Sequence, residues 1–459
     1  MVRPSIPWFG ERSDNSRGSH WCAAPWPNRL STRPVLTGDR LWAPLGVGRR
    51  VLGCSAPVLG QKWSYAVSNV AVMTNSHSDV LPFRIEIEQA EIDRLHRHLD
   101  ETRWPPVLPG DGWDTGVPVA WLRELSEYWR NDYDWRAAER ELNQIPQFTT
   151  IIDGQRIHFM HVRSAEPDAL PLILTHGWPG SVVEFLDVID PLTNPTAHGG
   201  DRGDAFDVVI PALPGFGFSG PVAESGWTTT RIATAWDELM TRLGYDRYGT
   251  QGGDIGAAVA PEVARIAPDR VIGVHTNGGP GGFPEVPLSE EVMATLSPIE
   301  RDRIARVEAF MREEFGYIAI QSTRPNTLGY GLVDSAVGQL AWIMDKFREW
   351  THPRQVLPDR ILSRDRLLTN VMTYWLTGTA ASSAYVGYAQ SAAWGAPKIN
   401  SGVPTAAIVF AHDVGIRQFA EADNTITRWT ELDRGGHFAA MEEPTALVAD
   451  IREFFRTLR

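Results

Sequence analysis

The sequence has almost no cysteine and no long run of apolar residues. Cys22 and Cys54 are the only cysteines among 459 residues, which excludes a disulfide framework, a thiolate metal site and a cysteine nucleophile from the chain beyond them. No stretch approaches the roughly 18 consecutive apolar residues that a membrane helix needs. We therefore expect no membrane partner. Because scarce cysteine is compatible with a reducing compartment, we expect a cytoplasmic protein.

Basic residues are also in the minority. The chain has 43 Lys and Arg against 56 Asp and Glu, a formal net charge of −13. Binding to nucleic acid needs clustered Lys and Arg that displace counterions from phosphates, so we expect no nucleic-acid partner. His96 and His98 are not spaced to share one face of a helix, as two metal ligands would be. The G-x-G-x-x-G run at residues 215–220 is followed by PVAESGW rather than by a helix, so the context of a dinucleotide site fails. We expect no metal and no cofactor.

The first 72 residues differ in composition from the rest of the chain. They contain nine Lys and Arg against three Asp and Glu, together with both cysteines and five tryptophans. They have neither the sustained periodicity of a helix or strand nor the pattern of a signal peptide. We expect residues 1–72 to be a largely disordered extension. The alternative is that Met73 is the true initiator and the residues before it are a mis-assigned start.

The remaining chain divides into four predicted parts. Residues 73–165 indicate helices that lead into two strands around an Asp153-Gly154 turn. Residues 166–285 alternate short apolar strands with helices, which indicates a parallel sheet covered on both faces. Residues 286–398 are mainly helical, and strands return in residues 399–459. We expect an α/β fold with a mostly parallel sheet, an inserted helical lid and an N-terminal helical extension domain.

Three chemically active side chains follow predicted strands in an order typical of α/β-hydrolases. Asp254 lies in GTQGGDIGAA, Asp413 follows the strand TAAIVF, and His437 follows a pair of glycines near the C-terminus. Nucleophile, acid and histidine occur in this order in that fold, and the chain contains no G-x-S-x-G serine motif. Glu421 and Asp433 are the alternatives to Asp413 as the carboxylate that orients the histidine.

An aspartate at a sharp strand-to-helix turn is suited to attack an sp³ carbon. A carboxylate can open a strained ring or displace a halide to form an alkyl ester, which water then hydrolyses at the aspartate carbonyl. His437, oriented by Asp413, would deprotonate that water. The backbone N–H groups of Trp178 and Ile255 are the candidate donors to the oxyanion. Because the turn is tight, side chains in place of its glycines would collide with neighbouring elements.

Several motifs beyond residue 80 carry a family resemblance. They are FRIEIEQAEIDRLHRHLDETRWP, HGWPGSVVEF, PALPGFGFS, QGGDIG, YIAIQSTRPNTLG, LLTNVMTYWLTGT and RGGHFAAMEEP. Together they resemble the microsomal-type epoxide hydrolases over residues 80–459. The resemblance implies an α/β-hydrolase core, an inserted helical cap and the extra N-terminal domain of that family.

The resemblance also implies site residues. It assigns the nucleophile, acid and base named above, and it adds two cap tyrosines that bind the epoxide oxygen. Tyr317, in FGYIAIQSTRP, matches the first tyrosine. For the second, the ungapped register falls on Gly387; Tyr388 is slightly favoured, and Tyr385 is the other candidate. A phenol suits this role because it can donate a hydrogen bond, then a proton, without being ionised at neutral pH.

The expected function is hydrolysis of an epoxide to a vicinal diol through a covalent Asp254 alkyl ester. The aromatic residues Trp178 and Tyr317 favour a bulky or aryl epoxide as the small-molecule partner, in xenobiotic breakdown or natural-product biosynthesis. Two alternatives stay open: a haloalkane or haloacid dehalogenase with the same aspartate, acid and histidine, and a non-catalytic binding protein of the same fold. A homodimer is compatible with the sequence, which does not decide it.

Overall fold

The computed structural model describes residues 79–110, 112–280, 286–391 and 398–459. The predicted extension over residues 1–72, and the alternative start at Met73, lie outside the described residues. Within the described part, one sheet of nine strands runs in the order β1-β2-β3-β5-β4-β6-β7-β8-β9. The strands are β1 (Leu81–Phe83), β2 (Gln147–Ile152), β3 (Gln155–Val162), β4 (Leu170–Thr175), β5 (Phe206–Pro211), β6 (Tyr248–Gly252), β7 (Val271–Asn277), β8 (Pro404–Val409) and β9 (Thr425–Glu431).

The sheet is mostly parallel, as the alternation of strands and helices predicts. Strands β5, β4, β6, β7, β8 and β9 pair in parallel, and β1, β2 and β3 add an antiparallel edge. The predicted hairpin joins β2 to β3: Asp153 and Gly154 have φ of 48° and 75°. Two successive residues at positive φ form the type of turn whose twist matches a β-hairpin.

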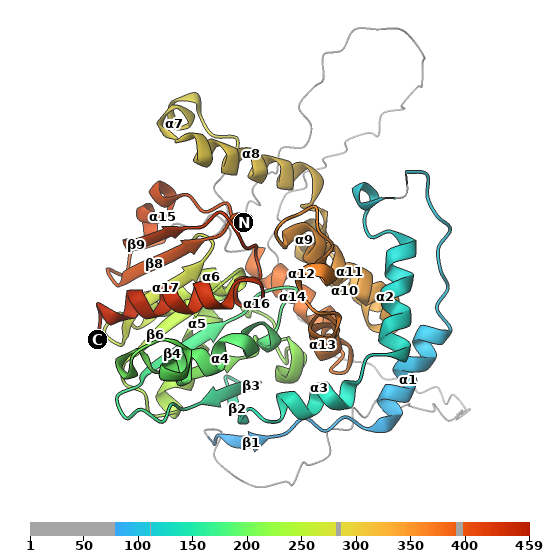
Figure 1. Cartoon of the computed structure of the whole chain (residues 1–459), viewed down its shortest axis with the longest axis horizontal. Helices are drawn as coiled ribbons and strands as arrows, with labels where there is room; N and C mark the ends of the chain where they lie inside the picture. The colour runs from blue at the N-terminus through green and yellow to red at the C-terminus, as the bar shows by residue number, and fades with distance from the viewer. Residues whose placement is uncertain (1–78, 111, 281–285, 392–397) are drawn as a thin grey trace, which may run out of the picture. The chain divides into compact units, whose positions relative to one another are not determined.

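Helices cover both faces of the sheet because side chains alternate along each strand. In β6, a Cβ added to Gly249 would meet the ring of Phe455 on α17, whereas the hydroxyl of Thr250 donates to the carbonyl of Ala260 on α6. Helix α4 packs with α17, and α5 packs with α6 (Figure 1). The core helices are α4 (Leu186–Thr193), α5 (Thr229–Arg242), α6 (Ile255–Ile266), α15 (Arg417–Asp423), α16 (Ala439–Glu442) and α17 (Pro444–Arg456).

A set of helices lies between β7 and β8 in the sequence and forms the cap. The members are α7 (Glu290–Thr295), α8 (Pro298–Glu313), α9 (Gly316–Thr323), α10 (Pro325–Asp334), α11 (Ala336–Trp350), α12 (Pro358–Ile361), α13 (Arg364–Trp375) and α14 (Ala380–Gln390). Helices α9, α10 and α14 contact one another. Because the strands before and after this insertion are neighbours in the sheet, the insertion leaves the core pairing intact.

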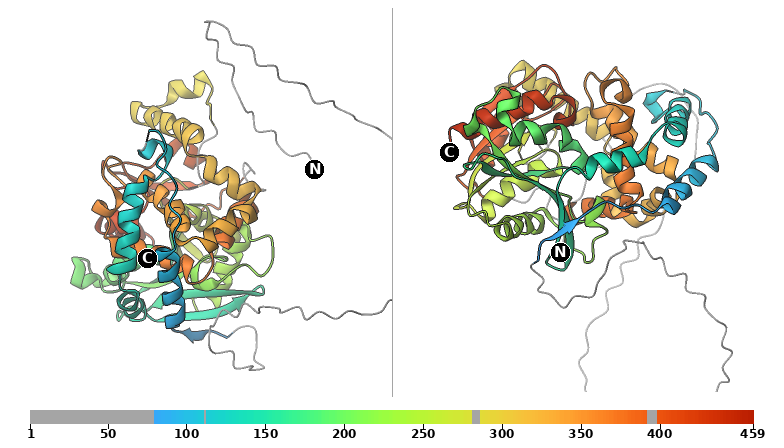
Figure 2. Two further views of the ribbon diagram at one scale, coloured as in Figure 1. Left: turned by 90° about the vertical axis from the view of Figure 1, so that its right-hand side faces the viewer. Right: turned by 60° about the horizontal axis from the view of Figure 1, so that its bottom comes forward.

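The N-terminal helices pack against the cap. They are α1 (Gln89–Asp100), α2 (Val119–Asn131) and α3 (Trp135–Leu142). Helix α1 buries Ile92, Leu95 and Leu99, which are three or four residues apart and so share one face of the helix. Helices α1 and α2 contact α11, and α3 contacts α13, so this domain supports the cap from outside (Figure 2).

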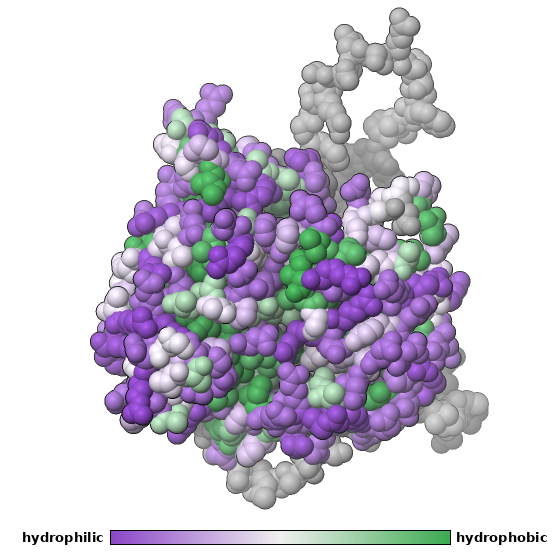
Figure 3. All heavy atoms as spheres, in the orientation of Figure 1, coloured by the Kyte–Doolittle hydropathy of each residue, from purple (hydrophilic) through white to green (hydrophobic). Residues whose placement is uncertain are grey.

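The surface is mainly polar on the face drawn in Figure 3, where apolar side chains form scattered patches. Among the residues that the structure describes, no helix is both long enough and apolar enough to cross a membrane.

Candidate active site

Asp254 stands at the turn between β6 and α6. It has φ of 55° and ψ of −120°, a conformation that residues other than glycine rarely adopt. A Cβ at Gly252 would lie 2.4 Å from the backbone of Gly256, and a Cβ at Gly256 would lie 2.0 Å from the carbonyl oxygen of Thr175. The structure therefore confirms that a side chain at either glycine would collide with a neighbouring element. The turn brings the carboxylate to the carboxyl end of β6.

The turn after β4 lies against the Asp254 carboxylate. The backbone N–H of Trp178 donates to Oδ1 of Asp254 at 2.8 Å. A Cβ at Gly177 would lie 2.2 Å from the same oxygen, so only glycine permits this approach. Ile255 occupies the first turn of α6, where backbone N–H groups have no partner within the helix. The two predicted oxyanion donors thus lie on the two turns that meet at Asp254.

Cap helix α13 holds the turn that carries Trp178. The buried Asn370 donates from its amide nitrogen to the carbonyl of Pro179 at 2.8 Å and accepts a hydrogen bond from the Ser181 hydroxyl at 2.7 Å. The hydroxyl of Tyr374, on the same helix, donates to the carbonyl of Gly180. These bonds fix the direction of the Trp178 N–H from the cap side.

His437 lies on the other side of the Asp254 carboxylate. Its Nε2 is 3.6 Å from Oδ2 of Asp254, and both side chains keep about a quarter of their surface exposed, 24% and 26%. Burial lowers the pKa of His437, and the negative charge of Asp254 acts in the opposite direction. The imidazole is therefore poised to be neutral, the form that can accept a proton.

Asp413 is buried at the end of β8, with 8% of its surface exposed. Its Oδ2 accepts the N–H of Phe410 at 2.9 Å. Burial raises the pKa of Asp413 to about 7. Among the residues that the structure describes, no hydrogen bond joins Asp413 to His437. Glu421 and Asp433, the alternatives for the carboxylate that orients the histidine, are both exposed. The role of Asp413 as orienting carboxylate stays a prediction.

Tyr317 enters from cap helix α9 and stacks on Trp178. The two rings lie 5.0 Å apart at 16°, and the ring of Trp350 packs on Tyr317 at 5.5 Å. Burial raises the pKa of Tyr317 well above its usual value, and the charges of Asp254 and Glu314 act in the same direction. The phenol therefore keeps its proton and remains a hydrogen-bond donor.

The two candidates for the second tyrosine lie together on α14. The rings of Tyr385 and Tyr388 stack at 5.7 Å. Tyr388 is 44% exposed, and within the described chain neither ring contacts Tyr317 or Trp178. Gly387, where the ungapped register falls, packs against Gln321 of α9. The choice between the two tyrosines stays open.

Comparison with known proteins shows the family of this chain. One family model, epoxide hydrolase N terminus, matches residues 80–185, and a second, alpha/beta hydrolase fold, matches residues 171–313. A putative epoxide hydrolase of Stigmatella aurantiaca is 45% identical over 383 residues, 83% of this chain and 86% of that protein. Epoxide hydrolase 1 of Sus scrofa is 34% identical over 435 residues, 87% of this chain and 93% of that protein. The chain belongs to the epoxide hydrolase family.

Solved structures agree with this assignment. The juvenile hormone epoxide hydrolase of Bombyx mori matches with a TM-score of 0.75 and 29% identity, over 83% of this chain and 95% of that one. The Aspergillus niger epoxide hydrolase matches with a TM-score of 0.73 and 30% identity, over 83% of this chain and 97% of that one. The predicted family and the predicted fold class, an α/β-hydrolase core with a helical cap and an N-terminal helical domain, are confirmed.

This epoxide hydrolase has a further carboxyl group near Asp254 that the sequence analysis did not single out. Burial raises the pKa of Glu184 well above its usual value, and the charge of Asp254 adds to this effect. A Cβ at Gly180 would lie 1.3 Å from Oε1 of Glu184, so the carboxyl lies directly on that glycine. The only hint in the sequence that Glu184 lies at the site was its place in the motif HGWPGSVVEF. That hint is weak, because a glutamate in the first turn of a helix is equally typical of a solvated face.

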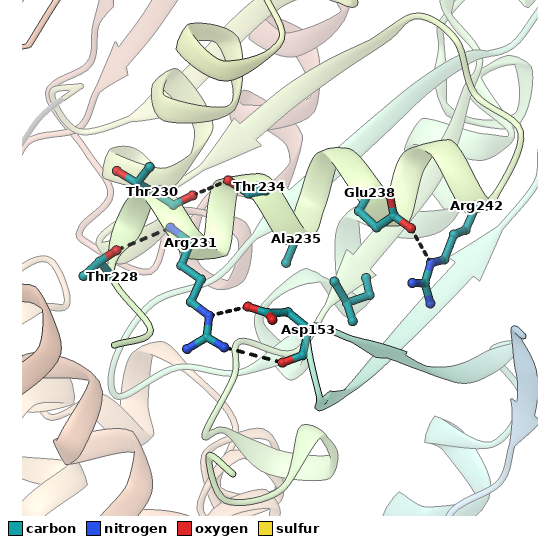
Figure 4. A pocket seen from close by; sticks show the side chains of 9 residues that line it. Asp153, Thr228, Thr230, Arg231, Thr234, Ala235, Glu238 and Arg242 are labelled. Atoms are coloured by element: carbon teal, nitrogen blue, oxygen red, sulfur yellow. Dashed lines mark hydrogen bonds and ion pairs between the residues drawn. The ribbon is translucent and has the colours of Figure 1, made fainter. Parts of the chain in front are cut away.

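A surface hollow of about 570 Å³ lies away from these residues, between the β2–β3 hairpin and α5 (Figure 4). Arg231 pairs there with Asp153 at 2.6 Å, and Arg242 pairs with Glu238 at 2.8 Å. None of the predicted site residues lines it. In the described ranges no three His, Cys, Asp or Glu side chains gather as a metal-binding set.

We expect Gly256→Ala to destabilise the enzyme, because the new methyl group would overlap the carbonyl of Thr175. Overpacking of this kind costs about 1–3 kcal/mol, so the melting temperature and activity should both fall. Gly331→Ala is the matched control, since it lies in α10 with no atom within 4 Å of the added Cβ. Equal melting temperatures for the two variants would contradict the packing argument.

The buried Asp413 also predicts a pH dependence of stability. A folded-state pKa of about 7 exceeds that of the unfolded chain, about 3.9. The native state therefore holds this proton more tightly, and the stabilisation, fully present below about pH 4, is lost as the pH rises through 7. Asp413→Asn should gain stability relative to the wild type between pH 5 and pH 8 in urea denaturation. Asp433→Asn, at an exposed position, should show no such trend.

Proposed function

We propose that this chain converts an epoxide and water into a vicinal diol through a covalent ester on Asp254. The observation that supports this most directly is the asymmetry of the carboxylate. Oδ1 accepts the N–H of Trp178 at 2.8 Å, and Oδ2 lies 3.6 Å from Nε2 of His437. One oxygen is thus held by a backbone donor, and the other is free to act as the nucleophile beside the base.

In the first step, Oδ2 of Asp254 attacks a ring carbon of the epoxide. The C–Oδ2 bond forms as the carbon–oxygen bond of the ring breaks, and the negative charge moves to the epoxide oxygen. Tyr317 donates a hydrogen bond to this oxygen and then its proton, which leaves a phenolate. The raised pKa of Tyr317 supports this role, because the phenol carries its proton before the attack.

In the second step, water hydrolyses the ester. His437 takes a proton from the water, whose oxygen attacks Cγ of Asp254 and places negative charge on Oδ1. The N–H groups of Trp178 and Ile255 stabilise this oxyanion. The Cγ–Oδ2 bond then breaks, and the diol oxygen takes the proton from His437. The new carboxylic acid of Asp254 releases its proton, and solvent carries a proton to the Tyr317 phenolate, which becomes a phenol again.

The charge of Asp254 ties the two steps together. While Asp254 is ionised, its charge raises the pKa of His437 against the effect of burial. Esterification removes the charge of the carboxylate that lies 3.6 Å from Nε2 and leaves the negative charge on Tyr317, so Asp254 no longer opposes the effect of burial on the pKa of His437 and the imidazole stays neutral. The base is then in the form that accepts a proton from water at the step that needs it.

The proposed substrate is a bulky or aryl epoxide. The rings of Trp178, Tyr317 and Trp350 pack together next to Asp254, and aromatic walls favour large apolar ligands. Several relatives are named juvenile hormone epoxide hydrolases, which supports a small organic epoxide as the class of substrate. Xenobiotic breakdown or natural-product biosynthesis as the setting, a cytoplasmic location and a homodimer stay predictions.

A single turnover in ¹⁸O-labelled water tests the covalent route. With styrene oxide as substrate, the label should enter the carboxylate of Asp254, because water attacks Cγ and the diol leaves with Oδ2. Digestion and mass analysis locate the label. Label found only in the diol would overturn the proposal. Release of halide from a model haloalkane as fast as diol from styrene oxide would favour the dehalogenase alternative.

Substitutions separate the two steps. Asp254→Ala should abolish turnover. His437→Gln should still be alkylated but should hydrolyse the ester about 10²–10⁴-fold more slowly, since it lacks the general base. Intact-protein mass spectrometry should then detect accumulated alkyl-enzyme. Equal residual activity in both variants would contradict the assigned roles.

Phenylalanine variants test the cap tyrosines. Tyr317→Phe should slow alkylation, because the epoxide oxygen loses its proton donor, again by about 10²–10⁴-fold. Because Tyr388 is 44% exposed, Tyr388→Phe should have a smaller effect than Tyr385→Phe. Rapid-mixing measurement of alkylation distinguishes them, and a larger effect for Tyr388→Phe would reverse the order.

A further inference from the structure

We propose that Glu442 is a positioning residue for His437, joining the loop that carries the base to the end of cap helix α11. This inference rests on the proposed function, in which His437 activates the hydrolytic water. Its consequence is that the second step, hydrolysis of the ester, depends on Glu442 more strongly than the first.

The carboxyl group of Glu442 contacts the backbone on both sides of His437. Oε1 accepts the N–H of Phe438 at 3.0 Å, and Gly436 lies against both carboxyl oxygens. A Cβ at Gly436 would lie 2.7 Å from both oxygens, so the glycine permits the close approach. The residues before and after the base are therefore held by one side chain.

The same carboxylate reaches the cap. Oε2 accepts the N–H of His352 at 2.8 Å, two residues beyond the end of α11. Because one carboxyl group bonds to both segments, the His437 loop cannot move away from the end of α11 without breaking one of these hydrogen bonds.

Other contacts join the same two segments. The N–H of His437 donates to the carbonyl of Trp350 at 2.9 Å, and the two rings lie 4.9 Å apart. Phe438 stacks on Phe347 of α11 at 4.0 Å and 11°. Trp350 also packs on Tyr317. The end of α11 thus contacts both Tyr317, the proposed proton donor, and His437, the proposed base. Glu442 adds a hydrogen bond to these ring contacts.

The neighbouring Glu443 shows that the arrangement is specific to one glutamate. Its carboxylate pairs with Arg434 at 3.1 Å, and the arginine is more than half exposed, 56%. For Glu442, by contrast, burial raises the pKa to about 8. Burial therefore disfavours the charge of this carboxyl group, but the backbone N–H groups beside it need an acceptor, which the carboxyl group provides.

Glu442→Ala would leave those donors without their acceptor and allow the His437 loop to shift. A displacement of about 1 Å in a catalytic group can cost about 10²-fold in rate. Glu442→Gln keeps the size and one acceptor oxygen, but its amide N–H₂ would face a backbone N–H donor. We expect ester hydrolysis to slow about 10–100-fold in the alanine variant and less in the glutamine variant, with little change in alkylation.

The experiment measures both steps in single turnover with styrene oxide. Alkylation is followed by quenched-flow mass spectrometry of the protein, and ester hydrolysis by the decay of the alkyl-enzyme. Glu443→Ala is the matched control, and both of its rates should equal those of the wild type. Accumulation of alkyl-enzyme in Glu442→Ala, with partial recovery in Glu442→Gln, supports the proposal.

Two results would overturn the proposal. One is wild-type hydrolysis of the ester in Glu442→Ala; the other is slowing of both steps by the same factor, which indicates a merely structural role. If the alanine variant does not fold, the glutamine variant is judged by the same criterion. Failure of the proposed function gives a different result, because no alkyl-enzyme would then form in the wild type or in His437→Gln.

Discussion

The hydrogen bond from the Trp178 N–H to Oδ1 of Asp254 is the interaction on which the site depends. It joins the turns after β4 and β6, which are adjacent parallel strands. Parallel pairing brings the carboxyl ends of both strands to one edge of the sheet, where turns from each can meet. Because the two turns are in contact, glycine is required at 177 and 256. The bond also makes the two carboxylate oxygens inequivalent, which a solvated aspartate would not be.

The inserted helices hold this arrangement from the opposite side. Asn370 on α13 bonds to the turn of Trp178, Trp350 on α11 bonds to the backbone of His437, and α9 supplies Tyr317. Each contact joins segments far apart in the sequence. The cap is therefore part of the geometry of the site as well as a cover for it.

Burial sets the protonation states in this region. It lowers the pKa of His437 and raises the pKa values of Asp413, Tyr317 and Glu184. In each case the low-dielectric surroundings disfavour the charged form. The result is a neutral imidazole and a protonated phenol, which are the forms that the proposed reaction requires. In the described chain no hydrogen bond joins Asp413 to His437, so the orientation of the histidine depends more on its backbone contacts.

The sequence by itself determined the strands of the parallel sheet, the hairpin at Asp153-Gly154, the turn at Asp254 and the family. These depend on local periodicity, on steric limits at glycines and on motifs of adjacent residues, all of which can be read along the chain. Only the tertiary structure decided that Glu442 reaches His352, that Asn370 holds the Trp178 turn, and that Tyr388 is exposed. A carboxylate in a helix has the same sequence pattern whether it faces water or accepts distant backbone N–H groups, because its partners come from segments whose positions are fixed only by packing.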